Sequence, residues 1–394
     1  MADFLQKRIL YIIPTLEQGG AEYCTVRQIN ELHRQNYPVF LLVLSRSVPL
    51  LDQLDLPHDQ IEVLDRAVPT FNARTLATAP LLVPRLLKLI QKWQIDCLLA
   101  VLPLAHFVAR LAKINAWWGR SFKVIPYHRS LEYAVMGLNR RDKRLYHRAS
   151  NALAYLADWK ALFVSEAVRE NIMAHLYTRH YAVIYNGILK QTVGDHLAKA
   201  YFKEKAIHKA PYIILFPGRL NAVKGQLFFL EAFQKLLTKH QLNPNDILLI
   251  LVGDGDFRPK IEQQIQQLQL KEFVHITGFV FNELLLSFHK MADLVVIPSH
   301  FEALGNVALE GLMQQSLMLT SNAGGLNEII QDGITGFKFE KDNGDALLEK
   351  LDFIYQNSQE QLIDKEKLKL IFEKKYSLAI NVQNLLNLIN NSSK

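Results

Sequence analysis

The sequence predicts an α/β fold with two Rossmann-like domains in tandem. Short apolar runs, typical of strands buried on both faces of a parallel sheet, alternate with longer segments of helical periodicity. Glycine-containing loops follow several of these runs, as expected where a strand leads into a helix at the carboxyl edge of a sheet. The chain has 394 residues, of which 49% are hydrophobic. This is enough for two domains of about 200 residues each.

The first half opens as a strand, a glycine loop, a helix and a second strand. The loop carries Gly19 and Gly20, without the Gly-x-Gly-x-x-Gly spacing of dinucleotide-binding proteins. Asn186-Gly187 is a turn signal that closes a first domain at residues 1–190. Strands are expected at 8–14, 39–44, 61–64, 97–102, 123–127, 152–155, 161–164 and 183–185, and helices at 21–35, 79–93 and 107–117 and after the capping residue Ser165.

The second half repeats this alternation after a polar, lysine-rich stretch that we interpret as a linker at residues 191–210. A second domain is expected at residues 211–376, followed by a final helical segment at 377–394. Strands are predicted at 212–216, 247–252, 274–277 and 294–297, and helices at 226–240, 282–292 and 378–389 and in the glutamine-rich segment before the third of these strands.

Composition excludes several protein classes. No run of 18 apolar residues occurs, so no transmembrane helix is expected. Met1–Arg8 runs directly into the first strand, which is unlike a signal peptide. Cys24 and Cys97 provide no disulfide framework, and both lie in apolar patterns typical of small core residues. We therefore expect a cytoplasmic protein.

Positive charge is concentrated in the first half of the chain. Residues 1–200 hold 25 Lys and Arg against 16 Asp and Glu, a net charge of +9, whereas the remainder has a net charge of −2. The basic run 140–148 and the aromatic–basic run 117–123 favour contact with an anionic membrane surface. A solvated basic helix and a partly buried Trp pair would explain them equally well. Nucleic acid is not an expected partner, because no recognised binding module accompanies the charge.

The stretch 293–311 contains the most informative pattern. A buried strand is followed by a loop that ends at Gly305, and Asn306 is expected to cap the helix that begins at the next residue. Backbone N–H groups at such a helix start bind phosphate. Glu302 and Glu310 bracket the turn and suit hydroxyl groups beside that phosphate, so a nucleotide sugar fits the pattern. The alternative is an ordinary crossover with two solvated glutamates.

Two cations, Arg219 and Lys224, lie in one short loop after the strand at 212–216. A leaving nucleoside diphosphate gains negative charge as the glycosidic bond breaks, so these cations would stabilise the transition state. Asp254-Gly255-Asp256 spells an Asp-x-Asp metal signature, but a metal would duplicate the work of the two cations. Gly253 and Gly255 are expected instead to line the base or diphosphate site. The alternative for Arg219 and Lys224 is two solvated loop charges.

Four segments resemble the family 4 retaining glycosyltransferases: Gly218-Arg219-Leu220 with Lys224-Gly225, Glu302-x7-Glu310, Gly324–Ile330 and Asp332–Gly336. The resemblance implies the GT-B fold, in which two Rossmann-like domains face each other across a deep cleft and a final helix crosses back to the first domain. The sequence departs from the family pattern at two positions, with Leu304 in place of an aromatic residue and Ala303 in place of glycine. Neither departure removes a carboxylate.

The resemblance also implies roles for individual residues. Glu302 lies by the donor sugar and Glu310 binds the ribose. His128, after the strand at 123–127, resembles a family histidine near the donor sugar or acceptor. An unperturbed histidine titrates near 6.5, and the alternative is that this lone histidine is structural. Gly19-Gly20-Ala21-Glu22 resembles the family's glycine loop, which faces the cleft, and the alternative is a plain tight turn. The candidate catalytic residues are thus Glu302, His128, Arg219 and Lys224, and the candidate donor-binding residues are Gly19, Gly20, Gly218, Gly253, Gly255, Leu304, Gly305, Asn306 and Glu310.

The expected activity is metal-independent, retaining transfer of a sugar from a nucleotide-diphosphate sugar to a glycan or lipid-linked acceptor, with no cofactor beyond the donor itself. A lipopolysaccharide or other cell-surface polysaccharide acceptor, docked on the basic first domain at the inner face of the cytoplasmic membrane, fits the charge distribution. Two alternatives remain open. One is a non-hydrolysing sugar-nucleotide epimerase, and the other is a catalytically silent sugar-nucleotide-binding subunit.

Overall fold

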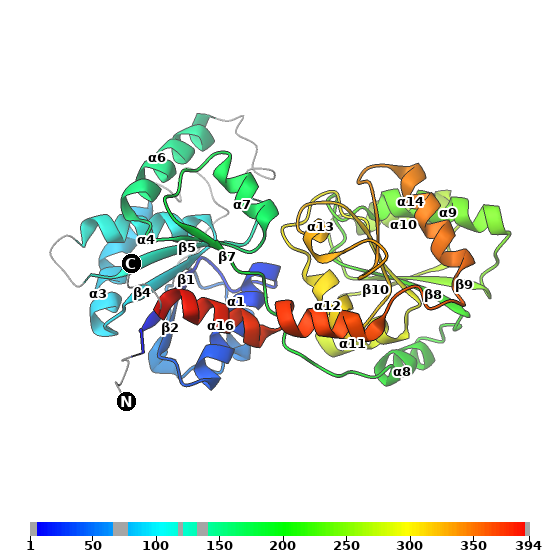
Figure 1. Cartoon of the computed structure of the whole chain (residues 1–394), viewed down its shortest axis with the longest axis horizontal. Coiled ribbons are helices and arrows are strands. Elements are labelled where there is room, and N and C mark those ends of the chain that lie inside the picture. The colour runs from blue at the N-terminus through cyan, green and yellow to red at the C-terminus, as the bar shows by residue number, and fades with distance from the viewer. Residues whose placement is uncertain (1–5, 66–77, 117–120, 132–140, 391–394) are drawn as a thin grey trace. The chain divides into compact units, whose positions relative to one another are not determined.

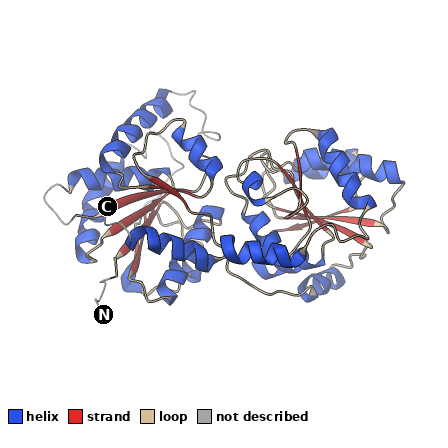
Figure 2. Cartoon of the chain, viewed as in Figure 1, coloured by secondary structure: helices blue, strands red, loops and turns tan. Residues whose placement is uncertain are grey.

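The computed structural model describes residues 6–65, 78–116, 121–131 and 141–390. The chain forms two compact units, each with one parallel sheet flanked by helices (Figures 1 and 2). The first unit comprises Met1–Leu189 and Tyr376–Lys394, and the second comprises Lys190–Lys375. No helix in the described ranges is long and apolar enough to cross a membrane.

The first unit has a seven-stranded sheet in the order β3-β2-β1-β4-β5-β6-β7. Its central strands are buried along their whole length, as expected of apolar runs with helices on both faces. The strands are β1 (Ile9–Ile13), β2 (Val39–Val43), β3 (Ile61–Val63), β4 (Cys97–Val101), β5 (Lys123–His128), β6 (Ala161–Phe163) and β7 (Tyr181–Val183). The helices are α1 (Gly20–Arg34), η1 (Leu51–Gln53), η2 (His58–Gln60), η3 (Ala79–Leu82), α3 (Val83–Lys92), α4 (Pro103–Asn115), α6 (Arg141–Ala157), α7 (Glu166–Met173) and α16 (Leu378–Asn390).

The second unit has a six-stranded sheet in the order β10-β9-β8-β11-β12-β13. The strands are β8 (Tyr212–Pro217), β9 (Ile247–Val252), β10 (Val274–Gly278), β11 (Leu294–Ile297), β12 (Met318–Ser321) and β13 (Phe337–Phe339). The helices are α8 (His196–Glu204), α9 (Gln226–His240), α10 (Arg258–Gln267), α11 (Asn282–Met291), α12 (Asn306–Gln314), α13 (Leu326–Ile329), α14 (Gly344–Gln356), α15 (Lys365–Ile371) and the π-helical turn η4 (Phe372–Tyr376).

Strand order in the second sheet creates a topological switch point. β8 pairs with β9 on one side and with β11 on the other, and all of these pairs are parallel. The chain therefore winds outward from β8 in one direction and from β11 in the other. The carboxyl ends of these two neighbouring strands mark the switch point, which is where open α/β sheets bind ligands.

Most predicted strands and helices are confirmed within one or two residues, but the strand expected at 152–155 is wrong. These residues lie inside α6, because a short apolar run of Ala, Leu and Tyr fits a helix as well as a strand. The cap predicted at Ser165 is confirmed, since its Oγ accepts a hydrogen bond from Val168 N at 3.0 Å. Helix α4 begins earlier than expected, at Pro103, because proline suits the first helical turn.

The segment expected to be a linker contains α8, which packs on α11. Phe202 is 5% exposed, and its ring lies 6.3 Å from the ring of Phe288. Ser287 Oγ accepts a hydrogen bond from Ala198 N at 2.9 Å and donates to Gly194 O at 2.8 Å. The segment is mostly polar in composition, so the one apolar face of α8 was not predicted. The packing of that face makes α8 part of the second unit.

The final helix α16 packs against α1 in the first unit, as Figure 1 shows in red and blue. Gln28 Nε2 donates to Asn381 Oδ1 at 2.7 Å, and both side chains are buried. The chain thus returns to its first unit after completing the second. Residues 117–120 and 140, and the side chains of 141–147, on which the membrane-surface prediction rests, lie outside the described residues.

We predict that Phe202→Ala lowers the free energy of unfolding by about 3 kcal/mol, because it leaves a cavity between α8 and α11. Lys203→Ala, on the exposed side of the same helix, is the matched control and should change it by less than about 0.5 kcal/mol. Urea denaturation followed by circular dichroism measures both. Equal effects of the two variants would show that α8 contributes no core packing.

Candidate functional site

The loops after β8 and β11 are in direct contact. His300 N donates to Val223 O at 2.8 Å, which joins the two backbones. Gly225 has φ +77°, and a β-carbon there would lie 2.2 Å from the Pro298 carbonyl oxygen. Only glycine satisfies both the left-handed conformation and the close approach. The two loops therefore meet at the switch point, and they bring their charged side chains together.

Lys224 and Glu302 form an ion pair across these loops. Lys224 Nζ lies 2.6 Å from Glu302 Oε2, and the side chains are 23% and 14% exposed. Partial burial shields the pair from water, so each charge fixes the position of the other more firmly than at an open surface. Two residues separated by 78 positions in sequence thus come together at the carboxyl edge of the sheet.

The start of α12 differs by one residue from the prediction. Gly305, not Asn306, is the capping residue, and Asn306 is the first helical residue. Gly305 takes this position because its φ of +103° is strained for any residue with a side chain, and a β-carbon there would lie 2.6 Å from Leu326 Cδ2. The first backbone N–H groups of α12 follow directly after Glu302 and its loop, where an anion is favoured.

Two further predicted residues are buried beside this helix start. Glu310 lies on α12 and is 8% exposed, and Leu304 is 1% exposed. A buried carboxylate needs polar partners, which suits Glu310 to specific hydrogen bonding rather than to general solvation. Leu304 belongs to the interior, so its side chain is not available to a ligand at the surface.

The glycines after β8 and β9 hold those two loops together. A β-carbon at Gly253 would lie 2.2 Å from the Gly218 carbonyl oxygen, and one at Gly255 would lie 2.3 Å from the Leu220 carbonyl oxygen. Arg219 lies in the same loop with an exposed side chain, and its carbonyl oxygen accepts from Gln226 Nε2 at 2.9 Å. The backbones of the loops after β8 and β9 are therefore in close contact beside the switch point.

The carboxylate of Asp254 has protein partners of its own. Asp254 Oδ1 accepts from Gly255 N at 2.8 Å, and Oδ2 lies 3.0 Å from Arg258 Nη1. Both contacts lower the pKa of Asp254, that from Gly255 most. Within the residues that the structure describes, no three His, Cys, Asp or Glu side chains form a group that could hold a metal ion.

His128 ends β5 in the first unit and is 2% exposed. Its ring stacks on Phe163 with centroids 5.2 Å apart and lies 4.5 Å from the His106 ring. Burial, together with the nearby charge of Arg110, lowers the pKa of His128 to about 3. The expectation that it titrates near 6.5 is therefore wrong, and the imidazole is neutral at physiological pH.

Gly19 and Gly20 begin α1 in the first unit, where Gly19 is the capping residue. The carboxylate of Glu22, in the first turn, folds back over this start, so that a β-carbon at Gly19 would lie 2.3 Å from Glu22 Oε2. A carboxylate at this end of a helix is favoured by the helix dipole.

Sequence reasoning missed two aromatic residues at the same edge of the second sheet. Phe279 and Phe281 follow β10 and are 66% and 55% exposed. Large apolar side chains that stay exposed beside a ligand crevice suggest contact with a ligand. The signal in the sequence was Gly278-Phe279-Val280-Phe281, in which alternate aromatic residues follow the strand instead of lying within it.

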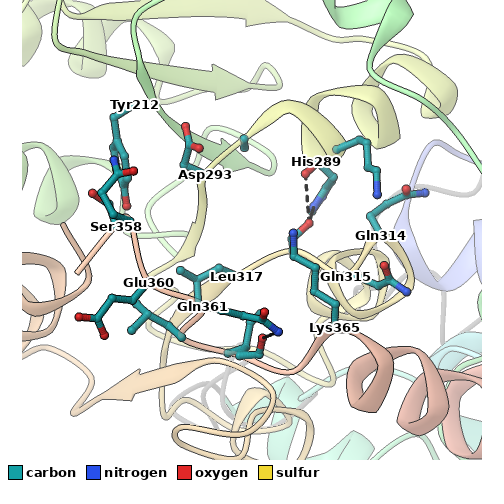
Figure 3. A pocket seen from close by; sticks show the side chains of 16 residues that line it. Tyr212, His289, Asp293, Gln314, Gln315, Leu317, Ser358, Glu360, Gln361 and Lys365 are labelled. Carbon is teal, nitrogen blue, oxygen red and sulfur yellow. Dashed lines mark hydrogen bonds between the residues drawn. The ribbon is translucent and has the colours of Figure 1, made fainter. Parts of the chain in front are cut away.

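A separate cavity of ≈ 420 Å³ lies at the opposite, amino edge of this sheet (Figure 3). Tyr212, Asp293 and Leu317 line it at the starts of β8, β11 and β12. His289 also lines it, and burial lowers the pKa of this histidine to about 3. None of the candidate catalytic or donor-binding residues lines this cavity.

Comparison with known proteins identifies the class. The chain superposes on HepE of Anabaena, which has been crystallised with UDP and with UDP-glucose, with a TM-score of 0.78 and 19% identity over 98% of this chain and 100% of that chain. The fold is that of the two-domain GT-B glycosyltransferases. Glycosyltransferase Family 4 matches residues 18–189, and Glycosyl transferases group 1 matches residues 198–369. The chain belongs to the family 4 glycosyltransferases.

Relatives differ in how much of their length is matched. An uncharacterized glycosyltransferase of Methanocaldococcus jannaschii is 31% identical over 235 residues, 57% of this chain and 58% of that protein. The chain thus spans little more than half the length of this relative. A 4-α-N-acetylgalactosaminyltransferase of Campylobacter jejuni, whose name gives a diphospho-undecaprenol acceptor, is 22% identical over 93% of this chain and 94% of that protein.

We predict that His128→Gln makes stability less dependent on pH. The folded-state pKa of His128, about 3, lies below the unfolded value near 6.5, so stability is lost as pH falls from 6.5 towards 3. Between pH 7 and pH 5, this group lowers the free energy of unfolding of the wild type by about 2 kcal/mol, and the variant should not show that decrease. Urea denaturation at pH 7 and at pH 5 measures the free energy of unfolding of each protein. The exposed His58→Gln is the control, and an identical loss in all three proteins would contradict the assignment.

Proposed function

We propose that this chain transfers a sugar, with retention of anomeric configuration, from a nucleoside-diphosphate sugar to a glycan or lipid-linked acceptor. The observation that supports this best is the Lys224–Glu302 pair, which lies 2.6 Å apart at the switch point of the second sheet. It combines a cation suited to a diphosphate with a carboxylate suited to sugar hydroxyls. The UDP and UDP-glucose complexes of HepE support a uridine nucleotide as donor.

Donor binding would break the ion pair between Lys224 and Glu302 and give each side chain a partner on the donor. Lys224 and Arg219 would bind the diphosphate, while Glu302 would accept hydrogen bonds from sugar hydroxyls. The backbone N–H groups at Gly305 and Asn306 would bind the phosphate nearest the sugar, and Glu310 would bind the ribose. The exposed rings of Phe279 and Phe281 offer surfaces on which the base would stack, because every base has a π-face.

In the transfer step, the bond between the anomeric carbon and the diphosphate oxygen breaks, and a bond to the acceptor oxygen forms on the same face. The acceptor proton passes to the departing diphosphate. Negative charge increases on the leaving group, so Arg219 and Lys224 stabilise the transition state more than the ground state. Their two positive charges take the role that a divalent metal has in other transferases, so we propose metal-independent activity.

The acceptor is proposed to bind the basic first unit. The net charge of +9 on residues 1–200 favours an anionic acceptor or a nearby anionic membrane surface. The Campylobacter relative, named for a diphospho-undecaprenol acceptor, supports a lipid-linked glycan. Synthesis of lipopolysaccharide or another surface polysaccharide at the inner face of the cytoplasmic membrane is the role that we propose.

We predict that one of UDP, GDP and ADP, or the matching hexose conjugate, raises the melting temperature of the wild type with or without EDTA. At 100 times its dissociation constant, a ligand stabilises the native state by about 2.7 kcal/mol. Arg219→Ala should lose most of this stabilisation, while Lys235→Ala on the far side of α9 should retain it. A requirement for a divalent metal would contradict the proposed diphosphate site.

We predict that Glu302→Gln lowers kcat about 10²-fold, because a neutral amide holds the sugar hydroxyls and Lys224 less well. The rate of nucleoside diphosphate release from the sugar nucleotide that stabilises the wild type, with octyl hexosides as acceptors, measures kcat. Glu349→Gln, exposed on α14, is the control and should keep wild-type activity. Conversion of the donor sugar without nucleoside diphosphate release would identify an epimerase instead.

A further inference from the structure

Arg129 is a buried cation in the centre of the first unit. It follows β5 directly and is 7% exposed. Its Nη1 donates to Asn186 Oδ1 at 3.1 Å, its Nη2 donates to Gln28 Oε1 at 2.9 Å, and its guanidinium lies 4.0 Å from the centre of the Tyr127 ring. Its Nε is buried with no hydrogen-bond partner. All of these partners are neutral.

No carboxylate pairs with Arg129 among the residues that the structure describes. Its nearest ionisable neighbours, Tyr11 and Tyr127, do not serve as counter-ions, because burial raises the pKa of both hydroxyls and keeps them protonated. Tyr11 OH donates to Gln28 Oε1 at 2.9 Å, as a neutral hydroxyl does. Among the described residues, the positive charge of Arg129 is therefore stabilised by dipoles and one aromatic face.

Arg110, in the same unit, provides the contrast. It is 1% exposed, and it binds Asp158 through two hydrogen bonds of 2.8 and 2.7 Å and Ser150 Oγ at 2.8 Å. This is the arrangement expected of a structural buried arginine, in which a bidentate carboxylate cancels the charge. Arginine stays charged in proteins, so leaving Arg129 without a carboxylate costs stability that a neutral side chain would not. A charge kept at such a cost suggests a ligand.

We propose that Arg129, with the hydroxyl of Ser130, binds a phosphate group of the acceptor. This rests on the proposed function, since it names the chemical class of the acceptor that the transferase uses. Ser130 is the next residue, is half-buried, and has no hydrogen-bond partner in the described part of the chain. Both residues lie at the carboxyl end of β5, the edge where parallel sheets bind ligands. An anion there would balance a charge that no carboxylate in the described ranges balances.

The melting temperatures of two variants distinguish phosphate binding by Arg129 from a purely structural role. In phosphate-free buffer, Arg129→Gln should melt within about 2 °C of the wild type or above it, because it removes an uncompensated charge. Arg110→Gln should melt about 6 °C lower or more, because it leaves Asp158 buried without a partner. A loss at Arg129→Gln as large as that at Arg110→Gln would assign Arg129 to the fold alone and overturn the proposal.

Anion binding is tested by titration in a background in which Arg219→Ala and Lys224→Ala remove the proposed donor site. Inorganic pyrophosphate and geranyl diphosphate should each raise the melting temperature of this background in a concentration-dependent way. Arg129→Gln should abolish the shift, and Ser130→Ala should reduce it. An equal shift with and without Arg129 would overturn the proposal. A larger shift with geranyl diphosphate would assign the phosphate to a lipid-linked acceptor, and equal shifts would assign it to the phosphate group alone.

A separate measurement keeps this proposal distinct from the proposed function. With the donor site intact, UDP should stabilise Arg129→Gln as much as it stabilises the wild type. Suppose that UDP stabilises both proteins equally, and that the melting-temperature shifts caused by pyrophosphate and geranyl diphosphate do not depend on Arg129. Then only the proposal that Arg129 binds an acceptor phosphate fails. If no sugar nucleotide stabilises the wild type, then the transferase proposal itself fails.

Discussion

The contact between the loops after β8 and β11 is the constraint on which the second unit's site depends. Gly225 fits beneath the Pro298 carbonyl oxygen, where a β-carbon would lie only 2.2 Å away, and His300 N is bonded to Val223 O. Any side chain at position 225 would push the loops apart. The 2.6 Å pairing of Lys224 with Glu302 follows from this approach, because neither side chain alone fixes the spacing.

The proximity of Lys224 and Glu302 follows from their positions in loops after neighbouring strands, because parallel strands end at one edge of a sheet. The mutual pairing of Lys224 and Glu302 was not foreseen. Each had been assigned separately to a ligand, and a sequence gives no indication of which partner a side chain chooses when the ligand is absent.

Predictions failed where the outcome depends on distant residues. His128 was expected to titrate normally, but Phe163 and His106, from two other elements, enclose its ring. The segment at 152–155 was expected to be a strand because four residues cannot distinguish a buried strand from a buried turn of helix. The linker prediction failed to detect α8, since two buried residues, Ala198 and Phe202, are a weak periodic signal among polar neighbours.

The proposed ligand-binding cations of the two units differ in their partners. Lys224 is paired with Glu302, so a donor diphosphate bound as we propose would replace an existing ion pair, and only the difference between the two interactions would appear as affinity. Arg129 has no carboxylate partner among the described residues, so an anion bound there would form an ion pair without breaking one. If both proposals hold, a phosphate on the acceptor would add an interaction that replaces none, whereas the donor diphosphate would add only a difference, and we expect the phosphate to contribute strongly to acceptor recognition.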